Sequence, residues 1–189
     1  DFNRTFPKNP KLIKDMTIGL VGFGIIGRKV AQRLSGFGCR LLAYDPFINK
    51  EAAEKMGVEA VSLEQLLKES DCVTMHARYM EETKDMIGKE QFAMMKPDAF
   101  IVNTARSRLI NEEAMLEALQ NHQIRGAALD VYDEEPLPLD SKFFELDNVI
   151  LSPHIAGTAG DWTKLTIAAM QEEVERYLKG EALKFQVNK

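Results

Sequence analysis

The sequence predicts an α/β fold, a doubly wound and mostly parallel sheet of the Rossmann type with helices packed on the sheet. Three observations predict it. Short apolar runs alternate with segments of helical periodicity along nearly the whole chain. A glycine-rich turn of the form G-x-G-x-x-G joins the first apolar run to the first helical segment. An acidic residue ends the second apolar run, at the distance that a dinucleotide-binding fingerprint requires.

The first strand is expected at residues 17–21, and the first helix at residues 28–34. The chain turns between them through three glycines with separate tasks. Gly22 permits the tight turn, Gly24 lets the backbone approach a pyrophosphate, and Gly27 lets the helix pack close to the strand. The phosphates are expected on free N–H groups at the positive end of the helix dipole.

The second strand is expected at residues 40–45 and ends in Asp45. A carboxylate there accepts hydrogen bonds from the adenosine ribose hydroxyls. It also repels a 2′-phosphate, so it favours NAD over NADP. The alternative is a turn residue before Pro46, since Asp-Pro commonly opens a turn.

The remaining elements continue the alternation. Ser62 and Gln65 form a capping-box sequence, and Asn111 is the expected N-cap of a later helix. Further helices are expected at 49–56, from 62 onward, 88–95, 112–121 and 162–179, and further strands at 58–61, 71–76, 99–103, 126–130 and 148–151. Right-handed crossovers then bring the strand C-termini to one edge, where ligands bind in such sheets.

Composition sets limits on function. The chain has 189 residues and a net charge of −5, which gives no support to nucleic-acid binding. Cys39 and Cys72 form no C-x-x-C pair and are expected to be reduced core thiols, which fits a cytoplasmic setting. No apolar run approaches the roughly 20 residues of a membrane span. No metal site is predicted.

Three stretches near the expected sheet edge have functional chemistry. Arg106 follows a strand, residues 130–136 form an acidic segment that ends at Pro136, and His154 precedes a turn of small residues. Taken singly, they read as a surface arginine, a solvated acidic loop and a structural histidine. Together they suit hydride transfer, because an Arg pairs with a substrate carboxylate and a His exchanges the proton. A carboxylate beside the imidazole orients it and stabilises its charged form.

These motifs, in this order, resemble the NAD-binding domain of the D-isomer-specific 2-hydroxyacid dehydrogenases. The resemblance runs from about Lys14 to about Gly180. It implies that Arg106, Glu135 and His154 are catalytic, and that the substrate is a small 2-hydroxy or 2-oxo acid. The positions implied to bind the NAD cofactor are Gly22, Gly24, Ile25, Ile26, Gly27, Asp45, Arg78, Thr104, Ala105, Asp130 and Gly157.

Two positions depart from the family pattern. The family commonly has His-x-Pro after its fourth strand, whereas this chain has His76-Ala-Arg78. The family also often has Gly after the catalytic Arg, where this chain has Ser107. Arg78 therefore has two interpretations beyond its place beside the cofactor. It helps to bind a more acidic substrate, or it is a surface arginine paired with Glu81 or Glu82.

The resemblance also implies how the chain is organised. We expect a lead-in at residues 1–14, a dinucleotide-binding domain at 15–180 and a tail at 181–189, with most of a substrate domain lying outside this chain. The chain alone is then expected to bind NAD(H) with little turnover, and the family suggests a homodimer. Two rival functions stay open, a non-catalytic NAD-sensing protein of the corepressor type and a Rossmann-like methyltransferase.

Overall fold

The computed structural model describes residues 10–158 and 160–186. Its internal contacts divide the chain into one unit that ends at Pro153 and a second unit that begins at His154. Each unit is therefore described by itself. The predicted domain limits at residues 15 and 180 stay predictions.

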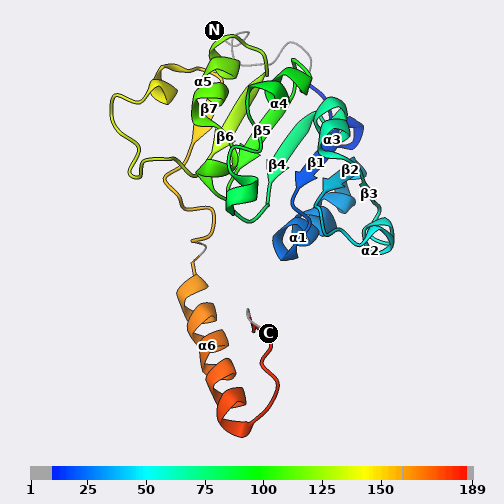
Figure 1. The fold of residues 1–189 in the computed structure, drawn as a ribbon, viewed down its shortest axis with the longest axis vertical. Helices are drawn as coiled ribbons and strands as arrows, with labels where there is room; N and C mark the ends of the chain where they lie inside the picture. The colour runs from blue at the N-terminus through cyan, green and yellow to red at the C-terminus, as the bar shows by residue number, and fades with distance from the viewer. Residues whose placement is uncertain (1–9, 159, 187–189) are drawn as a thin grey trace. The chain divides into compact units, whose positions relative to one another are not determined.

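The first unit contains a seven-stranded sheet with the order β3-β2-β1-β4-β5-β6-β7 (Figure 1). Every neighbouring pair of strands is parallel. The strands are β1 (Thr17–Val21), β2 (Arg40–Tyr44), β3 (Val58–Ala60), β4 (Cys72–Met75), β5 (Phe100–Asn103), β6 (Gly126–Leu129) and β7 (Val149–Leu151). The predicted doubly wound parallel sheet is confirmed, and the order reverses direction between β1 and β4.

Helices in the first unit pack into two separate hydrophobic clusters. The helices are α1 (Ile25–Leu34), α2 (Lys50–Glu54), α3 (Leu63–Glu69), α4 (Lys89–Met94) and α5 (Glu112–Gln120). Ala31 of α1 and Ala53 of α2 are fully buried in one cluster. Leu66 of α3, Phe92 of α4 and Leu119 of α5 are buried in the other. The apolar positions along the helices thus bury different strand residues, as expected for a sheet covered on two faces.

Helix α1 begins earlier than the sequence suggested. Its first residue is Ile25, and Gly24 is its N-cap. The N–H of Arg28 donates a 3.1 Å hydrogen bond to the Gly24 carbonyl, which closes the first helical turn. Gly27 therefore lies inside the helix, because the chain completes its turn within Gly22–Gly24. The N-terminal N–H groups of α1 consequently lie directly after β1.

The predicted helix caps are confirmed in part. Asn111 Oδ1 accepts a 2.9 Å hydrogen bond from the N–H of Ala114, as an N-cap should. Ser62 Oγ accepts one from the N–H of Gln65, at 3.2 Å. The reciprocal half of the capping box is replaced, because the Gln65 amide donates to Glu69 one turn later.

Two loops of the first unit contain short 3₁₀ turns. The loop after β5 includes η5 (Ser107–Leu109), and the acidic excursion after β6 includes η6 (Lys142–Glu145). Other 3₁₀ turns are η2 (Ile13–Asp15), η3 (Ser35–Phe37) and η4 (Glu81–Thr83).

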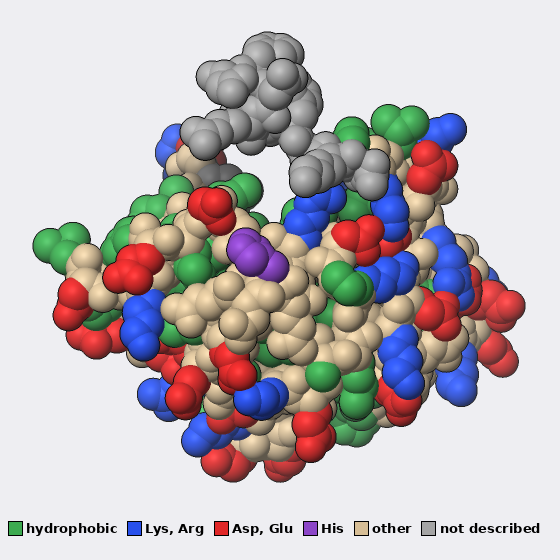
Figure 2. All heavy atoms as spheres, turned by 90° about the horizontal axis from the view of Figure 1, so that it is seen from above, with side chains coloured by type: hydrophobic (Ala, Val, Ile, Leu, Met, Phe, Trp, Pro, Cys, Tyr) green, Lys and Arg blue, Asp and Glu red, His purple; other side chains and the backbone are tan. Residues whose placement is uncertain are grey.

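On the face drawn in Figure 2, Lys and Arg side chains lie among Asp and Glu side chains.

The second unit contains α6 (Trp162–Lys179), with the limits that the sequence predicts. Gly180 ends it in the left-handed conformation at φ 70°, as a C-cap glycine does. Lys184 and Glu172 form an ion pair that joins the tail to the helix. No helix among the described residues is long and apolar enough to cross a membrane.

Candidate active site

The glycine turn after β1 packs tightly on one side and is open on the other. Gly22 has φ +97°, and a Cβ there would lie 2.4 Å from the backbone N of Ala77. A Cβ on Gly27 would lie 2.3 Å from the Gly22 carbonyl oxygen. By contrast, a Cβ on Gly24 would meet nothing within 4 Å. Gly22 and Gly27 are therefore required by packing, whereas Gly24 borders open space that a ligand can approach.

Asp45 lies directly beside this turn. Its Oδ2 accepts a 2.9 Å hydrogen bond from the N–H of Phe23, the residue between the first two glycines. Its Oδ1 accepts another from the N–H of Phe47, also at 2.9 Å. The carboxylate is thus fixed at the end of β2, and each oxygen keeps a lone pair for a further donor.

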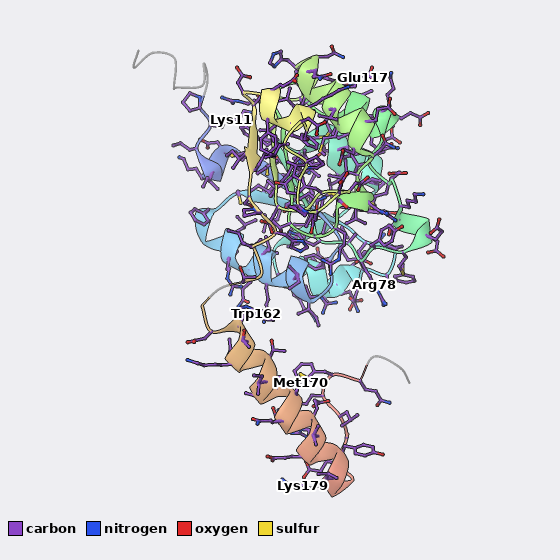
Figure 3. All side chains as sticks on the ribbon, turned by 90° about the vertical axis from the view of Figure 1, so that its left-hand side faces the viewer. Lys11, Arg78, Glu117, Trp162, Met170 and Lys179 are labelled. Atoms are coloured by element: carbon purple, nitrogen blue, oxygen red, sulfur yellow. The ribbon has the colours of Figure 1, made fainter. Side chains whose placement is uncertain are left out.

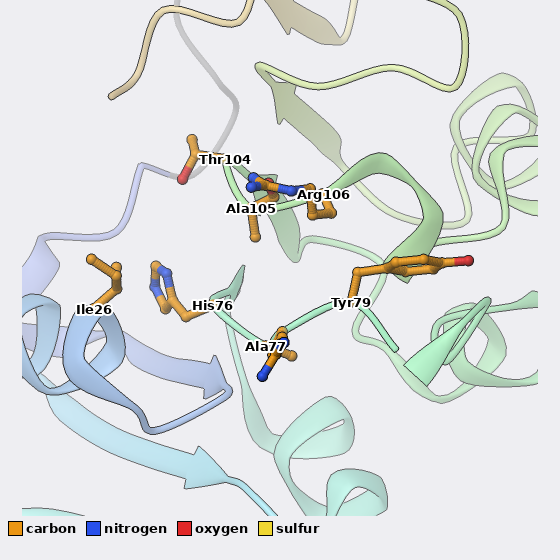
Figure 4. Close-up of a pocket in the computed structure, with 8 residues that line it drawn as sticks. Ile26, His76, Ala77, Tyr79, Thr104, Ala105 and Arg106 are labelled. Carbon is orange, nitrogen blue, oxygen red and sulfur yellow. The ribbon is translucent and has the colours of Figure 1, made fainter. Parts of the chain in front are cut away.

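A cavity of about 420 Å³ opens next to the turn, at the C-terminal ends of β4 and β5 (Figure 4). Its lining comes from the start of α1, the end of β4 and the end of β5. It brings together five positions predicted to be functional, which are Ile26, Arg78, Thr104, Ala105 and Arg106. The other lining residues are His76, Ala77 and Tyr79. The cavity lies where β1 and β4 adjoin, the point at which ligands bind in doubly wound sheets.

Asn103 holds the loop that carries Arg106. Its side chain is 1 % exposed, and its Oδ1 accepts a 3.0 Å hydrogen bond from the N–H of Ala105. Its Nδ2 donates a 2.9 Å hydrogen bond to the Arg106 carbonyl. Arg106 Nη1 in turn donates to the Ala105 carbonyl at 2.6 Å. The backbone of the loop is therefore fixed, while the guanidinium itself stays exposed at the cavity.

His76 is a lining residue whose state sequence reasoning did not anticipate. Its Nε2 lies 3.1 Å from Thr74 Oγ1, and burial lowers the pKa of His76 from 6.5 to about 4. The imidazole is therefore neutral at neutral pH. The sequence contains one signal for this contact. His76 ends an expected strand two residues after Thr74, so the two side chains lie on the same face of the sheet.

Asp130 and Glu135 are held by the segment that follows β6. Asp130 is 2 % exposed, and its Oδ1 accepts a 2.5 Å hydrogen bond from Ser152 Oγ. The Tyr132 hydroxyl lies 2.9 Å from the Ser152 carbonyl, and the Tyr132 N–H donates a 3.0 Å hydrogen bond to Glu135 Oε1. Tyr132 thus connects the ends of β6 and β7 and orients the exposed Glu135.

His154 and Gly157 belong to the second unit. His154 follows Pro153 and has a left-handed backbone, with φ +53°. Its side chain is exposed, and so is Gly157. The predicted catalytic set is therefore divided between the units, with Arg106 and Glu135 in the first and His154 in the second.

The first unit fits a dinucleotide. Ile25 and Ile26 are large apolar residues at the start of α1, yet they are 74 % and 60 % exposed. Together with the open side of Gly24 they form an apolar and backbone surface beside the Asp45 carboxylate. This combination suits NAD. The apolar side chains suit its rings, the backbone suits its pyrophosphate, and the carboxylate suits its ribose.

The chain is similar to a family model and to known proteins. Residues 3–156 match the family model described as D-isomer specific 2-hydroxyacid dehydrogenase, NAD binding domain. The chain is 43 % identical over 173 residues to D-3-phosphoglycerate dehydrogenase of Methanocaldococcus jannaschii, covering 91 % of this chain and 33 % of that protein. It is 41 % identical over 165 residues to glyoxylate reductase of Korarchaeum cryptofilum, covering 87 % and 50 %. The chain thus spans between a third and a half of these relatives.

A solved structure is also similar. D-lactate dehydrogenase with NAD⁺ from Lactobacillus jensenii gives a TM-score of 0.84 at 33 % identity, covering 100 % of this chain and 62 % of that one. The family match covers most of the chain, including the glycine turn, Asp45 and the whole cavity lining. The chain therefore belongs to the D-isomer specific 2-hydroxyacid dehydrogenase family, as its NAD-binding domain.

Proposed function

We propose that this chain is the cofactor-binding part of an NAD-dependent oxidoreductase that interconverts a D-2-hydroxy acid and its 2-oxo acid. The observation that carries the proposal is the cavity that Arg106 shares with Ile26, at the start of the glycine-turn helix. A guanidinium at this point suits a substrate carboxylate next to the reacting carbon, because its planar fork binds both oxygens.

The residues proposed to hold NAD have distinct tasks. The N–H groups after Gly24 bind the pyrophosphate, the Asp45 carboxylate binds the adenosine ribose, and Ile25 and Ile26 cover apolar surface of the cofactor. Thr104, Ala105, Asp130 and Gly157 complete the proposed set. Bound NAD supplies one kind of chemistry, hydride exchange with carbon 2 of the substrate.

The proposed catalytic residues account for the other bonds. Arg106 binds the carboxylate of the 2-oxo acid and polarises the adjacent carbonyl. In the direction of reduction, protonated His154 donates a proton to the carbonyl oxygen as carbon 2 gains hydride, which gives the 2-hydroxy acid. Glu135 orients the imidazole and stabilises its protonated form. In the reverse direction neutral His154 takes the hydroxyl proton.

The proposal is tested with NADH and a panel of 2-oxo acids, by the loss of absorbance at 340 nm. The assay uses this chain and a longer chain from the same gene, of the length of the relatives that it matches. We expect both chains to bind NADH and only the longer one to turn over. His154→Ala in the longer chain should remove most of kcat and leave NADH affinity unchanged. NADH binding without turnover of any acid by the longer chain would favour an NAD-sensing protein instead.

The chain alone provides a second check. Fast turnover by the 189-residue chain would contradict the proposal that half of the substrate cleft lies elsewhere. The homodimer and the cytoplasmic location that the sequence suggests stay predictions, and light scattering of the purified protein tests the first.

A further inference from the structure

The cavity beside the glycine turn contains a second arginine. Arg78 follows β4 and Arg106 follows β5, and both line the same space of about 420 Å³. Because β4 and β5 are neighbouring parallel strands, the two side chains start from adjacent strand ends. Figure 3 shows Arg78 at the edge of the first unit opposite to Lys11.

Neither guanidinium group has an acidic partner among the described residues 10–158 and 160–186. In the part of the chain that the structure describes, the Arg78 side chain makes no hydrogen bond or ion pair, so the pairing with Glu81 or Glu82 does not form. Within the same described ranges, Arg106 donates only to the backbone carbonyl of Ala105. None of the cavity-lining residues is an Asp or Glu. Two permanent positive charges therefore line one small space.

The His76 imidazole in the cavity adds no charge of either sign. Burial lowers the pKa of His76 to about 4, so its imidazole is neutral at pH 7. A substrate with one carboxylate would pair with Arg106 and leave Arg78 without a counter-charge. A substrate with two anionic groups matches both arginines.

We propose that Arg78 is a specificity-determining residue that binds a second anionic group of the substrate, so that the preferred 2-oxo acid carries a carboxylate or phosphate besides its 2-oxo carboxylate. This inference rests on the proposed function of the cavity. It assigns Arg106 to the carboxylate beside the reacting carbon and Arg78 to the distal anion.

The cofactor pyrophosphate is the other anion near the cavity, and the geometry favours the substrate over it. The pyrophosphate is expected on the open side of Gly24, at the free N–H groups of α1. Of the glycine-turn segment 22–27, only Ile26 lines the cavity. Arg78 thus belongs to the part of the site formed by β4 and β5, where Arg106 also lies.

The first test uses two acids that carry a second anionic group, oxaloacetate and 3-phosphohydroxypyruvate. Their kcat/KM values are compared with that for pyruvate, in the longer chain. Of these two acids, the one with the higher kcat/KM in the wild type is the reference. Arg78→Gln should lower its kcat/KM by about 10- to 100-fold, mostly through KM, because a charge-assisted hydrogen bond is lost. Its effect on pyruvate should stay within about threefold. Arg78→Lys should restore part of the loss, since it keeps the charge without the fork.

Arg33→Gln is the matched control, because Arg33 is exposed on α1, donates to the Lys29 carbonyl and lies outside the cavity lining. It changes the net charge by the same amount as Arg78→Gln and should leave kcat/KM for each of the three acids unchanged. If Arg78→Gln lowers kcat/KM equally for pyruvate, oxaloacetate and 3-phosphohydroxypyruvate, the inference is overturned.

The second test separates this inference from the proposed function. NAD⁺ replaces NADH, so the 2-oxo acid is not reduced. Calorimetry of the longer chain with NAD⁺ then measures the binding of each acid without turnover. Arg78→Gln should weaken oxaloacetate or 3-phosphohydroxypyruvate binding at least about tenfold and leave pyruvate binding unchanged. If no acid is turned over but this difference persists, the proposed function fails and the anion site stands. A loss of NAD⁺ affinity with unchanged acid affinities would assign Arg78 to the cofactor and overturn the inference.

Discussion

The N–H of Phe23 donates a 2.9 Å hydrogen bond to Asp45 Oδ2, which ties the glycine turn after β1 to the end of β2. The second carboxylate oxygen accepts from the N–H of Phe47. One carboxylate therefore satisfies two backbone donors and keeps lone pairs for the proposed ribose contact. The acid serves the fold of the turn and the proposed cofactor preference at the same time.

Asp45→Asn should weaken NADH binding about tenfold and narrow the preference for NADH over NADPH. An amide has only one acceptor oxygen, so one of the two backbone bonds is lost. The charge that repels a 2′-phosphate is also lost. Fluorescence titration with both cofactors measures the two affinities. Asp140→Asn, an exposed acid in the excursion after β6, is the matched control, and an unchanged NADH/NADPH ratio in Asp45→Asn would contradict the ribose assignment.

The three glycines of the turn should respond differently to alanine. Gly24→Ala should fold with an unchanged melting temperature, since its Cβ meets nothing within 4 Å, but it should bind NADH more weakly. Gly22→Ala should lower the free energy of unfolding by about 2–4 kcal/mol, because its Cβ would clash with Ala77 and its φ is +97°. Urea unfolding and NADH titration of both variants check this. Equal destabilisation by the two substitutions would contradict the open space found around a Cβ at Gly24.

Much of this fold follows from local patterns in the sequence. The apolar runs that become β1 and β5 lie between turn residues, and each is followed by a segment with helical spacing. Helix α6 has its predicted limits because Gly180 supplies the left-handed residue that ends it. Asn111 caps α5 because its side-chain oxygen reaches the N–H three residues on.

Other features depend on packing between distant segments, which a sequence pattern does not encode. The neutral state of His76 results from burial beside Thr74 and α1, so its residue type alone does not predict it. The absence of a pair between Arg78 and the acids of η4 depends on the path of the loop after β4. The start of α1 at Ile25 was missed because glycine inside a helix lowers helix propensity, whereas here close packing on Gly22 decides it.

His76 should make the protein less stable as the pH falls from 7 to 5. Its folded-state pKa is about 4 and its ordinary value is 6.5, so the unfolded chain binds the proton first. The free energy of unfolding should therefore fall by about 2 kcal/mol over this range through His76 alone. Urea unfolding at pH 7 and pH 5 should show this loss in the wild type and not in His76→Gln. His122→Asn is the control, since His122 is exposed and Asn tolerates its φ of 50°, and it should keep the loss.

Asp71 should produce a second loss of stability at lower pH. Asp71 lies before β4, and the residue is 5 % exposed. Burial alone would raise the pKa of Asp71. Hydrogen bonds from Lys11 Nζ at 2.7 Å, the Thr17 N–H at 2.8 Å and Lys96 Nζ at 2.9 Å outweigh it, so the pKa falls from 3.8 to about 2. The carboxylate thus joins the lead-in before β1 to the loop before β5.

Because the folded-state pKa of Asp71 is depressed, its contribution is complete above about pH 4 and disappears as the pH falls through about 2. Asp71→Asn should lower the free energy of unfolding by about 2 kcal/mol at pH 7 and by only about 1 kcal/mol at pH 3. Urea unfolding at the two pH values measures both differences. Asp140→Asn should change neither value by more than about 0.5 kcal/mol, because it replaces an exposed acid. If Asp71→Asn lowers the free energy of unfolding equally at pH 7 and pH 3, packing rather than the negative charge of Asp71 fixes the residues before β1 to the sheet.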